Sequence, residues 1–245
     1  MKQQTNVILV EPSGPVNIGS VARLCENFGV KELRLVAPRC DPNDDEARKM
    51  AVKGKRILDN AQEYSSLLEA IRDCHRVVAT CGRIDHGEIP LHDPEEAINW
   101  SLKASNTSPI ALVFGREDRG LTNQELLLAQ KVITLQTISS YPSLNLSHAV
   151  AIVLHELHRC EGEIFDSRPK ETSNNHPASP LEINNCLSDV EDLLLEIEFL
   201  YQHTAQARMS KIRALLQRAE VRPEEVSLIR GILRQMRWAI GKRNS

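Results

Sequence analysis

Short apolar runs alternate with stretches of helical periodicity through the first 160 residues of the chain. The apolar runs are rich in β-branched residues and predict buried strands over residues 6–11, 32–38, 76–80, 109–114 and 132–137. Helices are predicted from Ser20 to a C-cap at Gly29, over residues 61–74, from an N-cap at Asp93, and from about residue 143 to 160. Strands that alternate with helices in this way predict an α/β domain with a mainly parallel sheet.

The composition changes after this domain. Residues 166–181 are polar and proline-rich, which is typical of a linker. Three helical stretches follow, at residues 183–202, 208–219 and 223–239. We therefore predict a domain at residues 1–165, a linker at 166–181 and a helical C-terminal extension at 182–245.

Charge is distributed unevenly along the chain. With 30 Lys and Arg against 33 Asp and Glu, the net charge of −3 gives no overall sign of nucleic-acid binding. Residues 205–245, however, carry ten basic and three acidic residues, an excess that suggests a polyanionic partner. The alternative is that the six acidic residues of 181–200 balance this basic face within the protein.

Several classes of protein and site are not expected. The six cysteines form no C-x-x-C pair, and no signal peptide precedes the first strand, so we expect reduced thiols and a cytoplasmic protein. No apolar run reaches eighteen residues, so no membrane span is expected. His155 and His158 lack the H-E-x-x-H spacing of zinc enzymes, and we predict no metal site. Aromatic residues make up 4% of the chain, which argues against base stacking as the main binding device.

Polar residues follow several of the predicted strands. The strand at residues 109–114 ends at Gly115, and a charged turn over residues 116–119 leads to Gly120 and a capping box of Thr122 and Glu125. Taken alone, this pattern also fits an ordinary turn between a strand and a helix. Similar polar clusters occur at residues 17–23, 80–82 and 143–147. Clusters at several strand ends predict a composite site at the carboxyl edge of the sheet.

Three of these clusters resemble the motifs of a known enzyme family. N-x-G-x-x-x-R (residues 17–23), L-V-F-G-x-E-x-x-G-L (112–121) and S-L-N-L-S (143–147) are similar to the motifs of the SPOUT-class, SpoU-type RNA ribose 2′-O-methyltransferases. The order and spacing of the motifs are kept over residues 6–160. The segments 210–220 and 222–233 are similar to the C-terminal extension of the TrmJ-type tRNA (cytidine/uridine-2′-O-)-methyltransferases.

This resemblance implies a parallel-sheet SPOUT fold with a C-terminal trefoil knot, a homodimer, and S-adenosylmethionine as cofactor. The implied reaction is 2′-O-methylation of a pyrimidine ribose in the tRNA anticodon loop, of the cytidine/uridine 32 type. A ribosomal-RNA ribose methyltransferase and a non-catalytic RNA-binding protein with the same fold remain as alternatives.

The resemblance also assigns roles to residues. Arg23 would orient the ribose hydroxyl and stabilise its developing charge, because a guanidinium keeps its proton at neutral pH. Asn17 and Asn145 would orient Arg23 or the substrate, and Ser143 would bond to the ribose or the cofactor. Glu117 would pair with Arg23 or an RNA hydroxyl, or be a salt-bridged structural residue. The implied cofactor-binding residues are Thr80, Cys81, Gly82, Gly115, Leu135, Ser143 and Leu144.

Basic residues provide the predicted RNA contacts. They are Arg23, Arg48, Lys49, Lys53, Arg83, Arg119, Lys211 and Arg213. The cluster between Arg48 and Arg56 is interpreted either as a contact to the RNA backbone or as a solvated basic loop.

Overall fold

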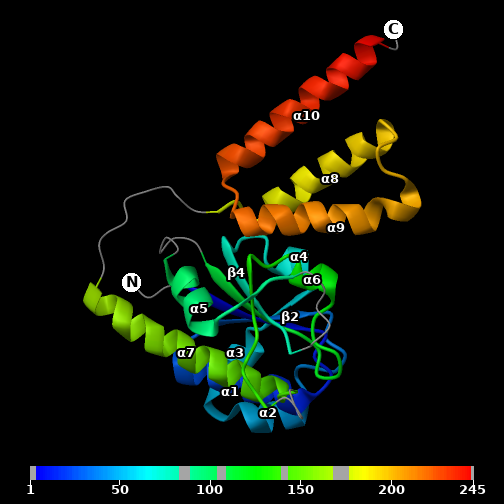
Figure 1. Cartoon of the computed structure of the whole chain (residues 1–245). Coiled ribbons are helices and arrows are strands. Elements are labelled where there is room, and N and C mark those ends of the chain that lie inside the picture. Colours follow the sequence, from blue (N-terminus) through cyan, green and yellow to red (C-terminus); the bar gives the residue numbers. More distant parts are fainter. Residues whose placement is uncertain (1–3, 83–88, 104–108, 139–142, 168–176, 244–245) are drawn as a thin grey trace. The chain divides into compact units, whose positions relative to one another are not determined.

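A computed structural model describes residues 4–82, 89–103, 109–138, 143–167 and 177–243 of the chain. The chain divides into two compact units, Met1–Ser173 and Asn174–Ser245 (Figure 1).

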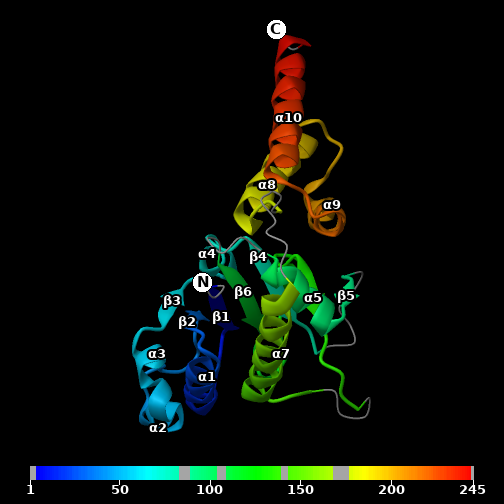
Figure 2. The same ribbon diagram turned by 90° about the vertical axis from the view of Figure 1, so that its left-hand side faces the viewer.

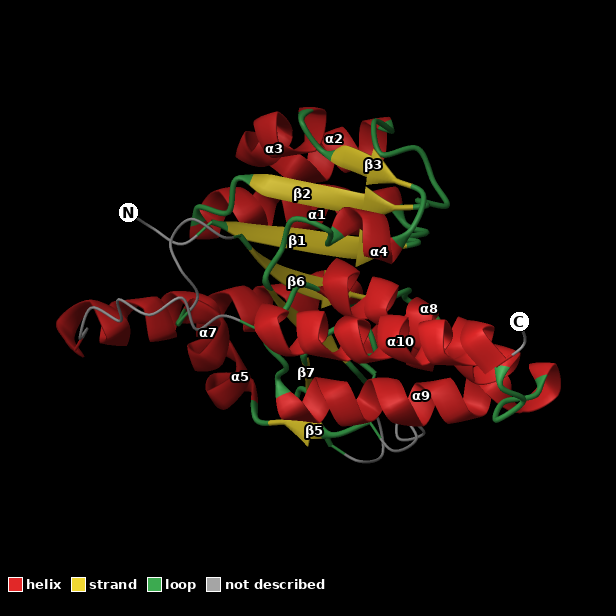
Figure 3. Ribbon diagram, turned by 90° about the horizontal axis from the view of Figure 1, so that it is seen from above, coloured by secondary structure: helices red, strands yellow, loops and turns green. Residues whose placement is uncertain are grey.

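The first unit is built on a seven-stranded sheet in the order β3-β2-β1-β6-β4-β7-β5, and all its described strand pairs are parallel. Figure 3 shows β3, β2, β1 and β6 side by side. The strands are β1 (Thr5–Val10), β2 (Glu32–Val36), β3 (Gln62–Tyr64), β4 (Arg76–Thr80), β5 (Leu91–His92), β6 (Ile110–Phe114) and β7 (Lys131–Ile133). The predicted α/β domain with a parallel sheet is confirmed, and the trefoil knot remains a prediction.

Four strands end next to one another in the middle of the sheet. Leu9 of β1 lies opposite Phe114 of β6, and Thr80 of β4 lies opposite Ile133 of β7. Strands β1, β2 and β3 extend the sheet towards one edge, and the chain then crosses to the other side of β1 to form β4. Because the strands are parallel, the segments that follow β1, β6, β4 and β7 meet at one edge, where open α/β sheets bind ligands.

Helix α7 packs against both α1 and α5, and the three helices lie on the same side of the sheet (Figures 1 and 2). Their apolar faces and the central strands form one buried cluster, which includes Ile18, Ile98 and Leu154. The helical elements of this unit are α1 (Pro15–Phe28), α2 (Asp45–Ala51), the 3-10 helix η1 (Val52–Gly54), α3 (Lys55–Asp59), α4 (Leu67–Ala70), α5 (Pro94–Leu102), α6 (Asn123–Leu126) and α7 (Leu146–Ser167).

The predicted helix signals are present in the structure. Asp93 accepts a hydrogen bond from the Glu96 N–H at 3.1 Å and caps α5. Thr122 and Glu125 form the expected capping box at the start of α6. Gly29 ends α1 in the left-handed conformation, at φ 71°. These local signals are confirmed because they depend only on residues within one turn of each helix end.

Two segments differ from the prediction. The basic stretch that includes residues 45–59 is helical, as α2, η1 and α3, rather than a solvated loop. The small side chains of Ala47 and Ala51 bury its inner face against α1, and alanines give little hydrophobic periodicity. Residues 61–74, predicted as one helix, contain β3 and the short α4 instead. Pairing of β3 with β2 at the edge of the sheet outweighs the local helical preference.

Smaller differences concern element ends. Strand β7 stops at Ile133, four residues before the predicted end, and α7 begins at Leu146 rather than near residue 143. The two-residue strand β5 was not predicted. Helix α7 continues to Ser167, past residue 165. The proposed division at 1–165, 166–181 and 182–245 stays a prediction.

Two glycines let α2 and η1 lie directly on α1. A Cβ atom at Gly19 would come 2.1 Å from the carbonyl oxygen of Ala47, and one at Gly54 would come 2.5 Å from that of Ala22. A larger residue at either position would force the backbones of the two helices apart. The close packing holds the basic segment 48–56 beside the helix that carries Arg23.

The second unit consists of α8 (Pro180–Glu196), α9 (Gln202–Ala219) and α10 (Pro223–Arg243). Leu187, Leu200, Ala205 and Met209 form a small core between α8 and α9. A separate cluster, which includes Cys186 and Val226, joins α8 to α10. In the described part of the chain, no helix combines the length and the apolar character needed to cross a membrane.

We predict that Gly19→Ala lowers the free energy of unfolding of the first unit by at least about 2 kcal/mol, because the added methyl group overlaps the Ala47 backbone. Urea denaturation followed by circular dichroism measures this loss. Gly162→Ala in α7 is the matched control, since a Cβ there meets no atom within 4 Å. It should stabilise the helix by up to about 1 kcal/mol. Equal effects of the two variants would contradict the packing argument.

Candidate active site

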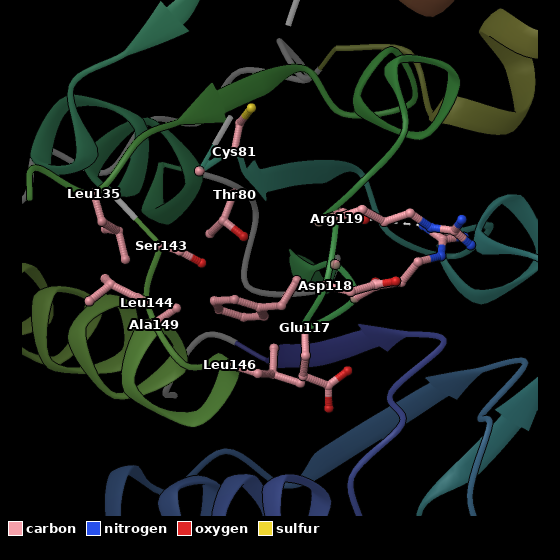
Figure 4. Close-up of a pocket in the computed structure, with 15 residues that line it drawn as sticks. Thr80, Cys81, Glu117, Asp118, Arg119, Leu135, Ser143, Leu144, Leu146 and Ala149 are labelled. Atoms are coloured by element: carbon pink, nitrogen blue, oxygen red, sulfur yellow. Dashed lines mark hydrogen bonds between the residues drawn. The ribbon is translucent and has the colours of Figure 1, made fainter. Parts of the chain in front are cut away.

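A cavity of about 270 Å³ opens at the carboxyl ends of β4, β6 and β7 (Figure 4). Its lining includes all seven residues assigned to the cofactor by resemblance: Thr80, Cys81, Gly82, Gly115, Leu135, Ser143 and Leu144. The structure thus gathers residues from four separate segments around one space. Their role in cofactor binding stays a prediction.

The cavity has an apolar side and a polar side. Figure 4 shows Leu135, Leu144 and Ala149 on one side, and the loop with Asp118 and Arg119 on the other. The loop after β4 is fixed by the Cys81 N–H, which donates to the carbonyl oxygen of Ile133 at 2.8 Å. An apolar wall facing main-chain groups is suited to a ligand with a flat ring and a polar chain.

The loop from Gly115 to Gly120 folds back on itself. A Cβ atom at Gly115 would lie 2.3 Å from the backbone of Gly120 and Leu121, and Gly120 has φ +67°. The Gly120 N–H donates to the carbonyl oxygen of Arg116 at 2.9 Å and closes the loop. The geometry of the turn therefore requires glycine at both positions. The loop that they allow lines the cavity.

Arg116 anchors this loop from behind, a role that the sequence analysis did not predict. Its buried guanidinium donates two hydrogen bonds to the Glu125 carboxylate, at 2.8 and 2.9 Å, and forms an ion pair with Glu11. It also donates to the Gly120 carbonyl oxygen at 3.2 Å. The bonds to Glu125 and Glu11 outweigh burial and raise the pKa of Arg116 further above its usual range. Arg116 thereby ties the end of β1 and the start of α6 to the loop.

Glu117 caps helix α1 from a distant part of the chain. Gly14, the N-cap residue of α1, has no side chain to satisfy the first N–H groups of the helix. The Glu117 carboxylate accepts bonds from the Ser13 N–H at 3.1 Å, the Gly14 N–H at 3.2 Å and the Asn17 side chain at 3.0 Å. A negative charge at a helix N-terminus is also favoured by the helix dipole. Burial opposes ionisation, but the bonds from Asn17 and Ser13 outweigh it, and the pKa of Glu117 is lowered.

A chain of side-chain amides extends this network to the third motif. Asn17 donates to Glu117, and its own oxygen accepts from the Asn145 amide at 3.1 Å. The Asn145 oxygen in turn accepts from the Ser147 N–H at 2.9 Å, in the first turn of α7. The starts of α1 and α7 are therefore joined to the Glu117 loop by hydrogen bonds between residues far apart in the sequence.

Arg23 stands apart from this network. It is exposed on α1 and makes no hydrogen bond or ion pair with any described residue. Glu117 pairs with the start of α1 and not with Arg23, which was one of the two partners expected for it, and it is not salt-bridged to any described residue. The other expected partner, an RNA hydroxyl, stays a prediction. Ser143 is exposed at the cavity. The structure brings Asn17, Glu117 and Asn145 together, with Ser143 at the cavity, and leaves Arg23 open to a ligand.

The predicted RNA-binding residues differ in their availability. Lys49, Lys53 and Lys211 are exposed, and Arg119 is 57% exposed with Glu11 3.9 Å away. Arg48 forms an ion pair with Asp59 at 2.9 Å.

Arg213 is half-buried and donates to the Asn184 side chain at 2.8 Å, and burial lowers the pKa of its guanidinium. Its charge is therefore partly used inside the second unit. Arg83 lies outside the described residues. Among the residues that the structure does describe, no group of three or more His, Cys, Asp or Glu side chains is placed to hold a metal ion.

Comparison with known proteins agrees with the geometry. The chain matches the SpoU rRNA Methylase family over residues 4–155 and the tRNA methyltransferase TrmJ C-terminal domain over residues 182–245. It is 32% identical over 237 residues to the "tRNA (cytidine/uridine-2′-O-)-methyltransferase TrmJ" of Salmonella typhimurium, with 95% of this chain and 96% of the relative covered.

Two solved structures are also similar. TrmJ from Z. mobilis ZM4 superimposes with a TM-score of 0.82 at 27% identity, covering 97% of this chain and 100% of that one. The SpoU methyltransferase AviRb from Streptomyces viridochromogenes, solved with its cofactor AdoMet, shares the fold with a TM-score of 0.51 at 21% identity, covering 66% of this chain and 62% of that one.

The fold and the family match therefore define an RNA methyltransferase. The chain belongs to the SpoU methyltransferase family and, within it, to the TrmJ-type tRNA (cytidine/uridine-2′-O-)-methyltransferases.

We predict that the stabilising effect of Glu11 depends on pH. The bond from Arg116, opposed by burial and assisted by Arg39, lowers the pKa of Glu11 from 4.5 to about 2. A carboxylate whose pKa is lowered on folding stabilises the protein above pH 4.5, and this stabilisation is lost as the pH falls towards 2. Glu11→Gln should therefore lower the urea midpoint at pH 7, and the deficit should shrink at pH 3.

Glu63→Gln is the control, because the Glu63 side chain is exposed and makes no hydrogen bond or ion pair with any described residue. It should change the midpoint little at either pH. A Glu11→Gln deficit that is equal at the two pH values would exclude a contribution from the ion pairs of Glu11.

Proposed function

We propose that the protein uses S-adenosylmethionine to methylate the 2′-hydroxyl of a pyrimidine ribose in the anticodon loop of tRNA, of the cytidine/uridine 32 type. The observation that supports the proposal is that two of the three motifs line one cavity, while Asn17 of the first motif is hydrogen-bonded to Glu117 and Asn145 of the other two. The names of the relatives support tRNA and a pyrimidine nucleoside as the substrate.

The cavity fits the cofactor in its chemistry. Its volume of about 270 Å³ is slightly below the usual range for small-molecule sites. Leu135, Leu144 and Ala149 offer a wall for an adenine ring, while the main chain around Gly115 and Gly120 would offer polar groups at the cavity. When bound, S-adenosylmethionine would supply the electrophilic methyl group that the ribose 2′-oxygen attacks.

The polar residues have distinct proposed roles in the reaction. Arg23, exposed and without a partner in the described structure, would hold the 2′-oxygen and stabilise its negative charge as the hydroxyl proton leaves. A guanidinium is a poor proton acceptor, so we assign the proton to a phosphate oxygen of the RNA. Ser143, at the cavity, would bond to the ribose or the cofactor. Asn17, Asn145 and Glu117 would keep the start of α1, and with it the Arg23 helix, in place.

The basic segment 48–56 would guide the RNA strand towards Arg23. Gly54 packs against the backbone of Ala22 and Arg23, so η1 and α3 lie directly beside the Arg23 backbone. Lys49 and Lys53 are exposed on this segment and would contact phosphates, which makes the affinity depend on salt. We also propose, from the family resemblance, a homodimer that acts in the cytoplasm.

Methyl transfer from labelled S-adenosylmethionine tests the proposal directly. Unmodified tRNA and ribosomal RNA are supplied in parallel, and the methylated nucleotide is mapped. Ribose methylation of an anticodon-loop pyrimidine would support it in full. Label in ribosomal RNA alone would support the proposed chemistry and contradict tRNA as the substrate. Ribosomal RNA is included because the description of the matching family names rRNA.

We predict that Arg23→Ala lowers the rate constant for methyl transfer to tRNA by about 100-fold or more, the cost of removing one group that stabilises a developing oxyanion. The thermal shift produced by S-adenosylmethionine should stay near that of the parent protein, since Arg23 does not line the cavity.

Arg72→Ala is the matched control, because Arg72 is also exposed and lies outside the cavity lining. It should retain full activity. An Arg23→Ala variant that transfers methyl groups at the parent rate would overturn the assigned role of Arg23.

A further inference from the structure

The turn between α8 and α9 exposes two aromatic rings. Phe199 is 57% exposed and Tyr201 is 55% exposed, although both are large and apolar. Leu200, between them, is buried among Leu187, Ala205 and Met209. One residue of the turn thus anchors it to the core of the second unit, while its two neighbours project outwards.

The turn is held in place by several hydrogen bonds. The Leu200 N–H donates to the carbonyl oxygen of Leu194 at 2.9 Å, and Arg208 donates to that of Phe199 at 2.9 Å. The Tyr201 carbonyl oxygen accepts from the Thr204 N–H at 2.8 Å at the start of α9. Rings on a fixed turn lose little conformational entropy when a ligand binds.

Each exposed ring has a neighbour of a type that also binds nucleic-acid bases. The rings of Tyr201 and His203 are stacked, with centroids 6.0 Å apart and planes 19° from parallel. The Arg208 guanidinium lies 5.7 Å from the centroid of Phe199. Aromatic, imidazole and guanidinium groups are the ones on which proteins stack unpaired RNA bases.

The charge around the turn fits RNA on the α9 side. Helix α9 contains no acidic residue, and Arg208 and Lys211 are exposed on it. Glu198 is the one acidic residue of the turn itself, and Glu196, at the end of α8, is 3.9 Å from Arg237. Cations beside exposed rings favour a polyanion with flat bases over an apolar protein partner.

We propose that Phe199, Tyr201, His203 and Arg208, together called the aromatic turn, form a stacking surface for unpaired bases of the RNA substrate. The proposal rests on the proposed function in that it takes RNA as the substrate. The proposal also modifies the expectation, drawn from the low aromatic content, that base stacking is not the main binding device. Aromatic residues are scarce in the chain, but all three Phe, Tyr and Trp residues of the second unit, Phe199, Tyr201 and Trp238, are more than half exposed.

The test uses the full chain and a fluorescein-labelled 12-nucleotide RNA, offered as a single strand and as a duplex with its complement. Fluorescence anisotropy gives the dissociation constant. We expect Phe199→Ala and Tyr201→Ala each to weaken binding of the single strand by about 5-fold to 100-fold, the measured range for one stacked base. Binding of the duplex should change less than 2-fold, because its bases are already stacked.

Leu215→Ala is the matched control, since Leu215 is an exposed, non-aromatic residue of α9 at 56% exposure. It should leave both dissociation constants unchanged. Unchanged binding of the single strand by the ring variants, or an equal loss for single strand and duplex, would overturn the aromatic turn as a stacking surface.

Light scattering on the same variants separates RNA binding from protein association. A change in oligomeric state in Phe199→Ala or Tyr201→Ala would assign the rings to a protein contact and overturn the proposal. Methyl transfer by the parent protein is a separate readout. If the parent protein methylates no tRNA, the proposed function fails, while the ring variants still decide whether the aromatic turn binds unpaired RNA.

Discussion

The first unit depends on one carboxylate that satisfies a helix start from outside the helix. Helix α1 has Gly14 as its N-cap and Pro15 as its first residue, which offer no capping side chain, and Glu117 accepts the N–H groups of Gly14 and of Ser13 before it. The same carboxylate holds Asn17, and Asn17 holds Asn145 at the start of α7. Glu117 thereby fixes the starts of α1 and α7 relative to the loop from Gly115 to Gly120. Its removal would leave the part-buried Gly14 N–H and Asn17 amide without this acceptor, which destabilises the start of α1.

Arg116 makes this arrangement possible by holding the loop that carries Glu117. Its guanidinium is buried between two carboxylates, and breaking one side of such a cluster leaves an uncompensated charge. The four adjacent charged residues of the loop therefore have different contacts. Arg116 faces inwards and ties the loop to β1 and α6, while Glu117 faces α1, and Asp118 and Arg119 border the cavity (Figure 4). This division explains why so much charge occupies one short turn.

In the helical second unit, the basic residues differ in whether they have partners within the unit. Its helices have small cores, and its basic residues fall into two groups. Arg230 and Arg237 pair with the carboxylates of Asp189 and Glu196 on α8, so part of the positive charge balances the acidic helix, which was one of the two alternatives from the sequence. Arg213 also has a partner on α8, the neutral side chain of Asn184. Lys211 and Arg208 remain exposed on α9. The charge excess of the tail is therefore partly structural and partly available to a ligand.

The sequence by itself determined those structural features that depend only on residues close together in the chain. The strands β1, β4 and β6, the caps at Asp93 and Thr122 and the positions of the three motifs were predictable, because periodicity and capping act over a few residues. Only the tertiary structure decided the partners. Ala47 and Ala51 form a helix because α1 covers them, and Glu117 bonds to α1 rather than to Arg23 because the sheet brings residues about a hundred positions apart into contact. Local patterns carry no information on such distances, since the partner is chosen by packing of the whole unit.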